Sequence, residues 1–176
     1  GRVPADKGYR FVVNELMKKE GSLDAAQDKQ GKELMVAKDG ADDVFKFIQN
    51  LTRQLAHESR ALALNYFEDE DIFWKEGWEE LLQEPEFGER ACIINFTELL
   101  KDFEAHIEDI GKTSGVNVYI GKENRSPKAK DFTVISSHYK LSGGEEGVIS
   151  ILGPKRMEYD KNIELINSLM RMLGNY

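Results

Sequence analysis

The sequence predicts an α+β fold in which an antiparallel sheet of about five strands is covered by N- and C-terminal helices, giving two layers. Three observations carry this prediction. Apolar residues recur at helical spacing in the longer amphipathic stretches, and they alternate with polar residues in shorter ones. Several of the short stretches are separated only by tight polar or glycine-containing turns. Strands joined in this way run antiparallel, and helices at both ends of the chain can cover one face of the sheet.

Composition limits the class of protein. The chain has 176 residues and a formal charge of −8. This length suits one globular domain, or a small domain with an appended helical arm. An acidic chain without a basic stripe is a poor candidate for holding DNA by itself, and the basic run at 122–130 is interpreted as a solvated loop. The single cysteine, Cys92, cannot form an internal disulfide, which favours a cytoplasmic location, and no membrane partner is expected.

The first part of the chain predicts two helices and a connection. Asp6 is a plausible N-cap for a helix from Lys7 to about Lys19. Residues 20–41 are rich in Gly, Asp, Lys and Gln and predict a mobile connection, with a short helix around 33–38. The next helix is expected to start at Asp42 or Asp43 and to end near Ser59.

The middle of the chain predicts a hairpin and helices. Alternation over 60–67 indicates a strand, the acidic residues 68–71 a turn, and 72–74 a returning strand. Gly77 is expected to break that strand before a short helix over 78–83. The further elements predicted are a long helix over 89–110, strands over 116–120, 132–139 and 148–152, a turn at Gly143-Gly144, and a closing helix over 158–173.

The search for chemistry finds no catalytic or metal-binding motif. His57, His106 and His138 lack a second ligand at metal-ligand spacing on their own elements, so they are interpreted as surface or half-buried side chains. We therefore expect no catalytic residue, no metal and no cofactor, and no enzymatic activity. A pocket joining His138, Glu123 and Arg156 would favour an enzyme instead.

Two further features leave alternatives open. Gly153-Pro154-Lys155-Arg156 lies between a predicted strand and a predicted helix, where basic residues could hold an anion. Because Pro154 removes a backbone donor, a structural corner with Arg156 bonded to a carboxylate or carbonyl is the preferred interpretation. Trp74 and Trp78, with Phe73 and Phe87 nearby, form either a partner-binding patch or packing beneath the hairpin.

Three separated segments resemble one family. The opening GRVPADKGYRF, the segment VYIGKEN at 118–124 and the segment GPKRMEY at 153–159 resemble, in that order, motifs of the heat-inducible transcription repressor HrcA family. Pro85-Glu86-Phe87 is a weaker fourth match. The residues that carry the resemblance, interpreted as structural, are Gly1, Arg2, Pro4, Asp6, Gly8, Tyr9, Arg10, Gly121, Glu123, Asn124, Gly153, Pro154, Arg156, Met157 and Tyr159.

The resemblance implies a fold and a role. Such repressors carry an N-terminal winged-helix DNA-binding domain followed by a GAF-like α+β domain with an inserted dimerising subdomain. As homodimers they bind an inverted-repeat operator called CIRCE upstream of chaperone genes, and the GroE chaperonin is an implied partner. The stretch between Leu55 and Pro85 is shorter than the family pattern.

The resemblance divides the chain into two parts. Residues 1–41 are expected to be a linker from a missing DNA-binding domain, with the first helix and a mobile connection, and residues 42–176 a GAF-like regulatory and dimerisation domain. Operator DNA would be bound only through the missing domain. A GAF-like small-molecule sensor and a chaperonin-interaction module are the alternative functions; a large pocket with convergent polar groups would favour the sensor.

Overall fold

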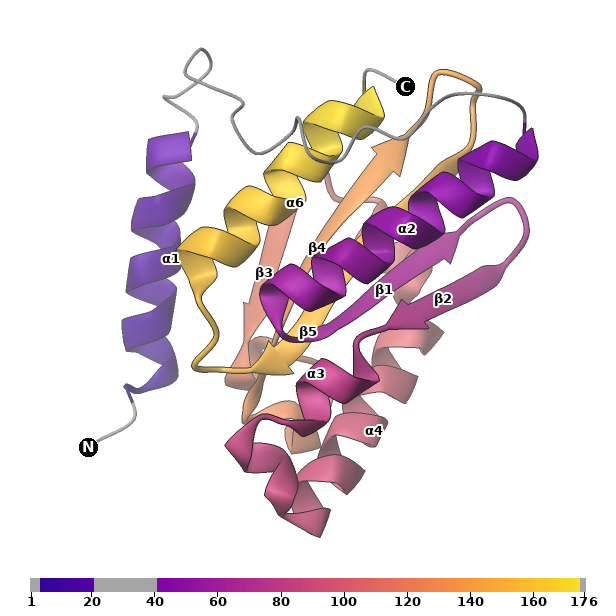
Figure 1. Ribbon diagram of the computed structural model, residues 1–176. Helices are drawn as coiled ribbons and strands as arrows, with labels where there is room; N and C mark the ends of the chain where they lie inside the picture. Colours follow the sequence, from indigo (N-terminus) through magenta and orange to yellow (C-terminus); the bar gives the residue numbers. More distant parts are fainter. Residues whose placement is uncertain (1–3, 21–40, 175–176) are drawn as a thin grey trace.

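The computed structural model describes residues 4–20 and 41–174. They form a five-stranded antiparallel sheet with helices packed on both of its faces (Figure 1). The strands are β1 (Leu62–Phe67), β2 (Ile72–Glu76), β3 (Val116–Ile120), β4 (Phe132–Lys140) and β5 (Glu146–Pro154). The helices are α1 (Asp6–Glu20), α2 (Ala41–Ser59), α3 (Trp78–Leu82), η1 (Pro85–Gly88), α4 (Arg90–Ala105), α5 (Ile107–Gly111), η2 (Gly121–Glu123), η3 (Pro127–Ala129) and α6 (Tyr159–Gly174).

The sheet has the order β2-β1-β5-β4-β3, and every neighbouring pair is antiparallel. The last strand in the chain, β5, therefore lies at the centre, between β1 and β4. It is buried along nearly its whole length, which explains why Val148, Ile149, Ile151 and Leu152 are apolar on both sides of the buried Ser150. The predicted antiparallel sheet of five strands and the predicted α+β class are confirmed.

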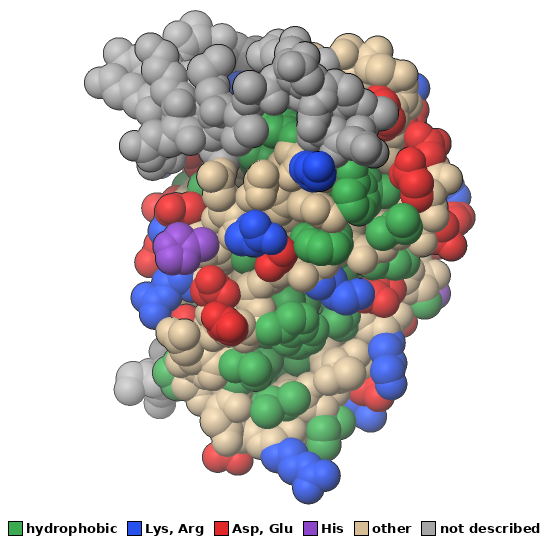
Figure 2. Space-filling view, turned by 45° about the vertical axis from the view of Figure 1, so that its right-hand side comes forward, with side chains coloured by type: hydrophobic (Ala, Val, Ile, Leu, Met, Phe, Trp, Pro, Cys, Tyr) green, Lys and Arg blue, Asp and Glu red, His purple; other side chains and the backbone are tan. Residues whose placement is uncertain are grey.

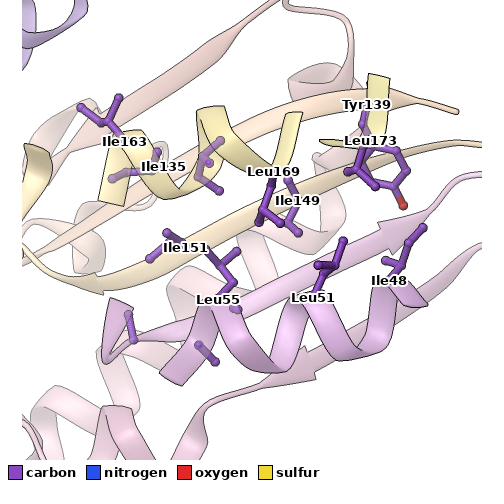
Figure 3. Close-up of a cluster of buried hydrophobic side chains, with 14 of the residues drawn as sticks. Ile48, Leu51, Leu55, Ile135, Tyr139, Ile149, Ile151, Ile163, Leu169 and Leu173 are labelled. Atoms are coloured by element: carbon purple, nitrogen blue, oxygen red, sulfur yellow. The ribbon is translucent and has the colours of Figure 1, made fainter. Parts of the chain in front are cut away.

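One face of the sheet is covered by α2 and α6, which lie side by side along the strands (Figure 1). Figure 3 shows apolar side chains of both helices directed at β4 and β5, among them Leu51, Leu55 and Leu169 opposite Ile149 and Ile151. Each fully buried aliphatic side chain of this kind contributes about 1.5 to 3 kcal/mol through apolar burial. This is the layer that the sequence predicts from N- and C-terminal helices.

The opposite face is covered by a second helical layer, so the domain has three layers where two were expected. Phe96, Leu99 and Phe103 of α4 pack with Phe132 and Val134 of β4 in a separate buried cluster. The physical reason is that the central strands carry apolar side chains on both faces of the sheet. Both faces must therefore be covered. The amphipathic stripe of α4 supplies the second cover.

The helix predicted over 89–110 is interrupted, which corrects that prediction. It divides at His106, whose backbone has φ −122° and ψ 18°, outside the helical region. The His106 ring nitrogen Nδ1 lies 2.8 Å from the carbonyl oxygen of Asp102, and the His106 backbone N–H donates to Phe103 instead. The side chain thus competes with the regular helical hydrogen bond, and the chain restarts as α5 in a new direction.

Other boundaries agree with the sequence. The hairpin with its acidic turn is formed by β1 and β2, and the strand break falls at Gly77. Gly77 has φ +98°, and a side chain there would collide with the carbonyl oxygen of Ala61, so both conformation and space require glycine. The mobile connection predicted for 20–41 and its short helix around 33–38 lie outside the described residues, apart from the ends of α1 and α2. Among the helices described, none is long and apolar enough to span a bilayer.

Candidate functional site

The three segments that carry the family resemblance meet around α1, although they are far apart in the sequence. The Asp6 carboxylate at the start of α1 accepts a hydrogen bond from the backbone N–H of Lys122 at 3.1 Å and binds the Lys155 ammonium at 2.7 Å. The hydrogen bond from Lys155 is the main reason that the pKa of Asp6 lies below its usual value, against the opposing effect of burial. We name the five residues Asp6, Arg10, Lys122, Glu123 and Lys155 the α1 clamp.

Asp6 therefore serves a tertiary contact, which corrects its predicted role as an N-cap. The helix already includes Asp6, and the backbone N–H groups of Gly8 and Tyr9 bond to the carbonyl of Ala5. Gly121 makes the tertiary contact possible: it has φ +54°, and a Cβ at this position would collide with the Asp6 carboxylate.

The second half of the clamp is a planar fork between Arg10 and Glu123. Arg10 donates through Nε to Glu123 Oε1 at 2.8 Å and through Nη2 to the other carboxylate oxygen, and it also donates to the carbonyl of Val118 at 2.6 Å. Glu123 additionally accepts the backbone N–H of Ile120 at 2.8 Å. Burial would raise the pKa of Glu123, but the hydrogen bonds from Arg10 and Ile120 outweigh it and the pKa is lowered. Such charge-assisted, bidentate pairs fix geometry as well as energy.

Apolar contacts complete the attachment of α1. Val13 is fully buried, and the Tyr9 ring packs on Tyr159 at the start of α6 with ring centroids 5.6 Å apart. The Tyr159 hydroxyl donates to the carbonyl of Lys155 at 2.6 Å and shares a hydrogen bond with Thr133 at 2.8 Å. Burial raises the pKa of Tyr159, so the phenol stays protonated. The clamp, β4 and α6 are thereby linked in one network.

The remaining resembling residues hold the loops in place. The Asn124 amide donates to the carbonyls of Gly121 at 2.9 Å and Phe132 at 3.1 Å, which ties the loop after β3 to the start of β4. Gly153 lies close to Ala61, because a Cβ on Gly153 would be 3.2 Å from the Ala61 Cβ. Asn124 and Gly153 therefore make contacts within the fold.

The corner after β5 is also built as expected. Arg156 binds Glu84 and Glu86 beside η1, with Nη2 2.8 Å from Glu86 Oε2. That hydrogen bond is the largest influence lowering the pKa of Glu86. The backbone N–H of Met157 bonds to the carbonyl of Pro154, which closes the turn. Arg156 therefore joins two protein segments, as the corner interpretation predicts.

The structure separates the groups that would have indicated an enzyme. Glu123 lies in the α1 clamp and Arg156 lies with Glu84 and Glu86, whereas His138 contacts Glu68 and Glu146 at the other end of β4 and β5. The other histidines are also paired near the surface: His57 lies 3.7 Å from Glu80, and His106 lies near Asp102. No residue from Gly1 to Val3 is described, so Gly1 and Arg2 remain unplaced. Pro4 and Gly8 are exposed at the start of α1.

The two tryptophans differ: Trp74 fits the interpretation as packing beneath the hairpin, and Trp78 fits the interpretation as part of a partner-binding patch. Trp74 is half-buried and packs edge-on against Phe45 of α2. Trp78 is 39% exposed and touches Phe96 with one edge. Leu82, Ile93 and other apolar side chains near it are also exposed. In Figure 2 hydrophobic side chains gather on the lower half of the visible face, at the height of α3 and α4 in Figure 1.

A groove of about 590 Å³ runs between α2 and α6. Leu51, Leu55 and Leu165 contribute apolar surface, and the charged residues beside them pair loosely with one another, as Lys161 does with Glu58 at 3.9 Å. Its volume falls in the range of small-molecule sites, but its charged groups are exposed rather than convergent in a buried pocket.

Comparison with known proteins decides the family. A family model described as "HrcA protein C terminal domain" matches residues 11–163 of the chain. The chain belongs to the HrcA family. The relative named "Heat-inducible transcription repressor HrcA" from Thermoanaerobacter pseudethanolicus is 32% identical over 145 residues, which cover 76% of this chain and 42% of the relative. The HrcA protein of Herpetosiphon aurantiacus is 30% identical over 126 residues, covering 69% of this chain and 36% of that protein.

The HrcA relatives bear on the earlier expectations in two ways. The chain spans about two fifths of the length of these curated relatives. The relatives are named as transcription repressors and not as enzymes.

A crystal structure of a hypothetical protein at 2.2 Å resolution has the same fold, with a TM-score of 0.77 and 16% identity, covering 100% of this chain and 79% of that one.

Sequence reasoning missed the partner of Asp6. Lys155 is 149 residues away along the chain, and no local pattern links the two positions. It also missed the carboxylates around His138, because the search considered ligands on one element and these come from neighbouring strands. Only the strand register brings such residues together.

Proposed function

We propose that this chain is the regulatory and dimerisation part of a repressor of heat-shock chaperone genes, acting in the cytoplasm. In this proposal a winged-helix domain on the N-terminal side of α1 binds the inverted-repeat operator, and residues 42–176 form the regulatory body. The observation that carries the proposal is the α1 clamp. It is the point at which the resembling segments converge, and it holds the helix that would lead to a DNA-binding domain.

The physical role proposed for the clamp is to set the geometry of two DNA-binding domains. An inverted repeat is bound by two domains held at a fixed separation. Binding of the second half-site becomes intramolecular in a dimer, which raises avidity by orders of magnitude only when both sites are within reach. A helix fixed by directional ion pairs passes the orientation of the body to the attached domain. Phe11 and Val12, which are 67% and 49% exposed on α1, offer apolar surface for that domain.

The test uses the complete repressor and DNA with one or two half-sites. Glu123→Gln removes the charge that binds Arg10 while preserving the shape of the side chain. We expect weaker binding to the full inverted repeat, by about tenfold, and unchanged binding to a single half-site, measured by fluorescence anisotropy at fixed salt. Glu15→Gln is the matched control, because it removes the same charge from α1 at a residue that pairs with Lys18 of the same helix and does not belong to the clamp.

Two outcomes would contradict the proposal. Equal losses on one and two half-sites would mean that the clamp does not control the pairing of the DNA-binding domains. A strictly monomeric state of this chain at tens of micromolar, measured by sedimentation, would contradict dimerisation through this part. The GroE chaperonin is the proposed activating partner, and its addition should restore operator binding to the wild-type repressor after heat treatment.

The volume of the groove between α2 and α6, about 590 Å³, is the one observation behind a second candidate function, a small-molecule sensor. A sensor would retain its ligand at stoichiometric amounts when purified gently from its host. Native mass spectrometry of the complete repressor tests this directly. Detection of the bare protein mass alone, together with operator binding that Leu165→Trp leaves unchanged, would oppose the sensor function.

A further inference from the structure

Three potential metal ligands converge at the end of the sheet distant from the α1 clamp. His138 Nε2 of β4 lies 3.2 Å from Glu68 Oε1 and 3.3 Å from Glu146 Oε2. One ligand atom from each of these residues lies within 4.8 Å of the other two. All three side chains are only partly exposed, between 24% and 33%.

The strand register brings these residues together. Residues 66–67 of β1 pair with 147–148 of β5, and the backbone N–H of Glu68 continues the ladder by donating to the carbonyl of Glu146 at 3.1 Å. His138 pairs with Val148, so it lies diagonally across from Glu146 on the same face. His138 and Glu146 lie on paired strands, and Glu68 is the first residue after β1, held by its backbone hydrogen bond to Glu146; two of the three ligands are therefore fixed by the sheet and the third is tied to its edge.

The charges of the cluster formed by Glu68, His138 and Glu146 favour binding of a cation. Glu68, the first residue after β1, lies beside Glu146 of β5, and two neighbouring carboxylates repel each other when both are ionised. Lys140 binds Glu146 through Oε1, which leaves Oε2 directed at His138. Within the described residues, His138 is the ion-pair partner of Glu68. The two carboxylates outnumber the one Lys140 ammonium that binds this cluster.

We propose that Glu68, His138 and Glu146 form a binding site for a divalent transition-metal cation of the Zn²⁺ class. The donor set is one imidazole nitrogen and two carboxylate oxygens, and further positions remain for water. Donors at Zn²⁺ distances in a tetrahedral site are about 3.4 Å apart, and the two separations from His138 Nε2 match this value. Lys140 orients the Glu146 carboxylate from outside the set, as partners of metal ligands commonly do.

Binding of the cation would link strands and stabilise the folded domain. The cation would join β1, β4 and β5 at the end of the sheet where the β1–β2 and β4–β5 turns lie. It would stabilise the folded domain only, since the ligands are scattered over 79 positions in the unfolded chain, from Glu68 to Glu146. The inference is independent of operator binding and of the α1 clamp.

The experiment titrates Zn²⁺ into the chelator-treated chain by isothermal calorimetry. We expect one Zn²⁺ per chain, and a rise in melting temperature of about 5 °C or more at a free Zn²⁺ concentration 100 times Kd. Co²⁺ serves as a second probe, with visible absorption bands expected on binding. His138→Gln and Glu68→Gln should each weaken Zn²⁺ binding by about tenfold or more.

The matched control is His106→Gln. His106 is another partly exposed histidine beside a carboxylate, but its neighbour is Asp102 on the same helix. This variant should bind Zn²⁺ as the wild type does. The proposal is overturned if the wild type shows no saturable Zn²⁺ binding, or if His106→Gln and His138→Gln have equal effects. It is also overturned if His138→Gln changes only acid stability, which would indicate a proton-bridged ion cluster. Melting of every variant with chelator present confirms that each is folded.

Discussion

The attachment of α1 can be tested with a single substitution, Glu123→Gln, in this chain alone. The variant keeps the shape of the side chain and an oxygen that can accept the N–H of Ile120, but it loses the ionic fork with Arg10. Hydrogen bonds to charged groups contribute about 1.5 to 3 kcal/mol, and exposed ion pairs about 0.2 to 1 kcal/mol. Because both side chains are about one third exposed, we place the loss between these limits, at about 1 to 2 kcal/mol.

A loss of this size should appear first in α1. The equilibrium for detaching the helix should shift by about five- to thirty-fold, and the amide protons of residues 10–19 should exchange faster by the same factor. Amide protons of β4 at the centre of the sheet provide the internal reference. Glu15→Gln again supplies the control. Unchanged exchange in α1, or an equal acceleration in β4, would refute the idea that this ion pair holds α1 as a separately opening element.

Three further outcomes are expected. Gly121→Ala should lower the free energy of unfolding by about 2 kcal/mol in urea titrations, because the residue needs a positive φ and its Cβ would displace Asp6. Phe96→Ala should cost about 3 to 5 kcal/mol and exposed Ile94→Ala less than about 0.5 kcal/mol; similar values for the two would refute the second helical layer. The pKa values of Asp6 and Glu123 are lowered on folding, so their contribution to stability is present above the unfolded pKa values, about 4.5 at most, and is lost as the pH falls through the lowered values. The melting temperatures of wild type and Asp6→Asn should therefore converge as the pH falls below the lowered pKa of Asp6, and a difference that stays constant with pH would contradict this.

The sheet was predictable because its residues follow a local rule. Alternation in 62–67 and the acidic turn after it specify a hairpin whatever the rest of the chain does. The strand order was not predictable from such patterns, because β5 enters between β1 and β4 through contacts between distant residues. The second helical layer shows the same limit. The apolar stripe of α4 was visible, but nothing local specifies which face of the sheet it covers.

The candidate site was predictable only in part. The resemblance to a family selected Asp6, Arg10 and Glu123, and the structure places them in one network. It did not select Lys155, whose ammonium is the largest influence on the pKa of Asp6. It also did not select the carboxylates beside His138. Both omissions have the same cause. A contact made across the fold leaves no trace in the spacing of residues along the chain.

The way α1 is held suits an element that must change its state. The helices α2 and α6 are fixed by extended apolar burial, whereas Val13 is the fully buried apolar side chain that α1 contributes to the core. Its other apolar contacts, from Tyr9, Leu16 and Met17, are only partly buried, and its ion pairs are partly exposed. A contact worth a few kcal/mol can be shifted between mostly attached and mostly detached by a partner with a comparable preference for one state. A helix buried like α2 would require far more, and so could not respond. A partner that favours the attached state therefore needs to differ in affinity between the two states by only about 100-fold to move α1 from mostly detached to mostly attached.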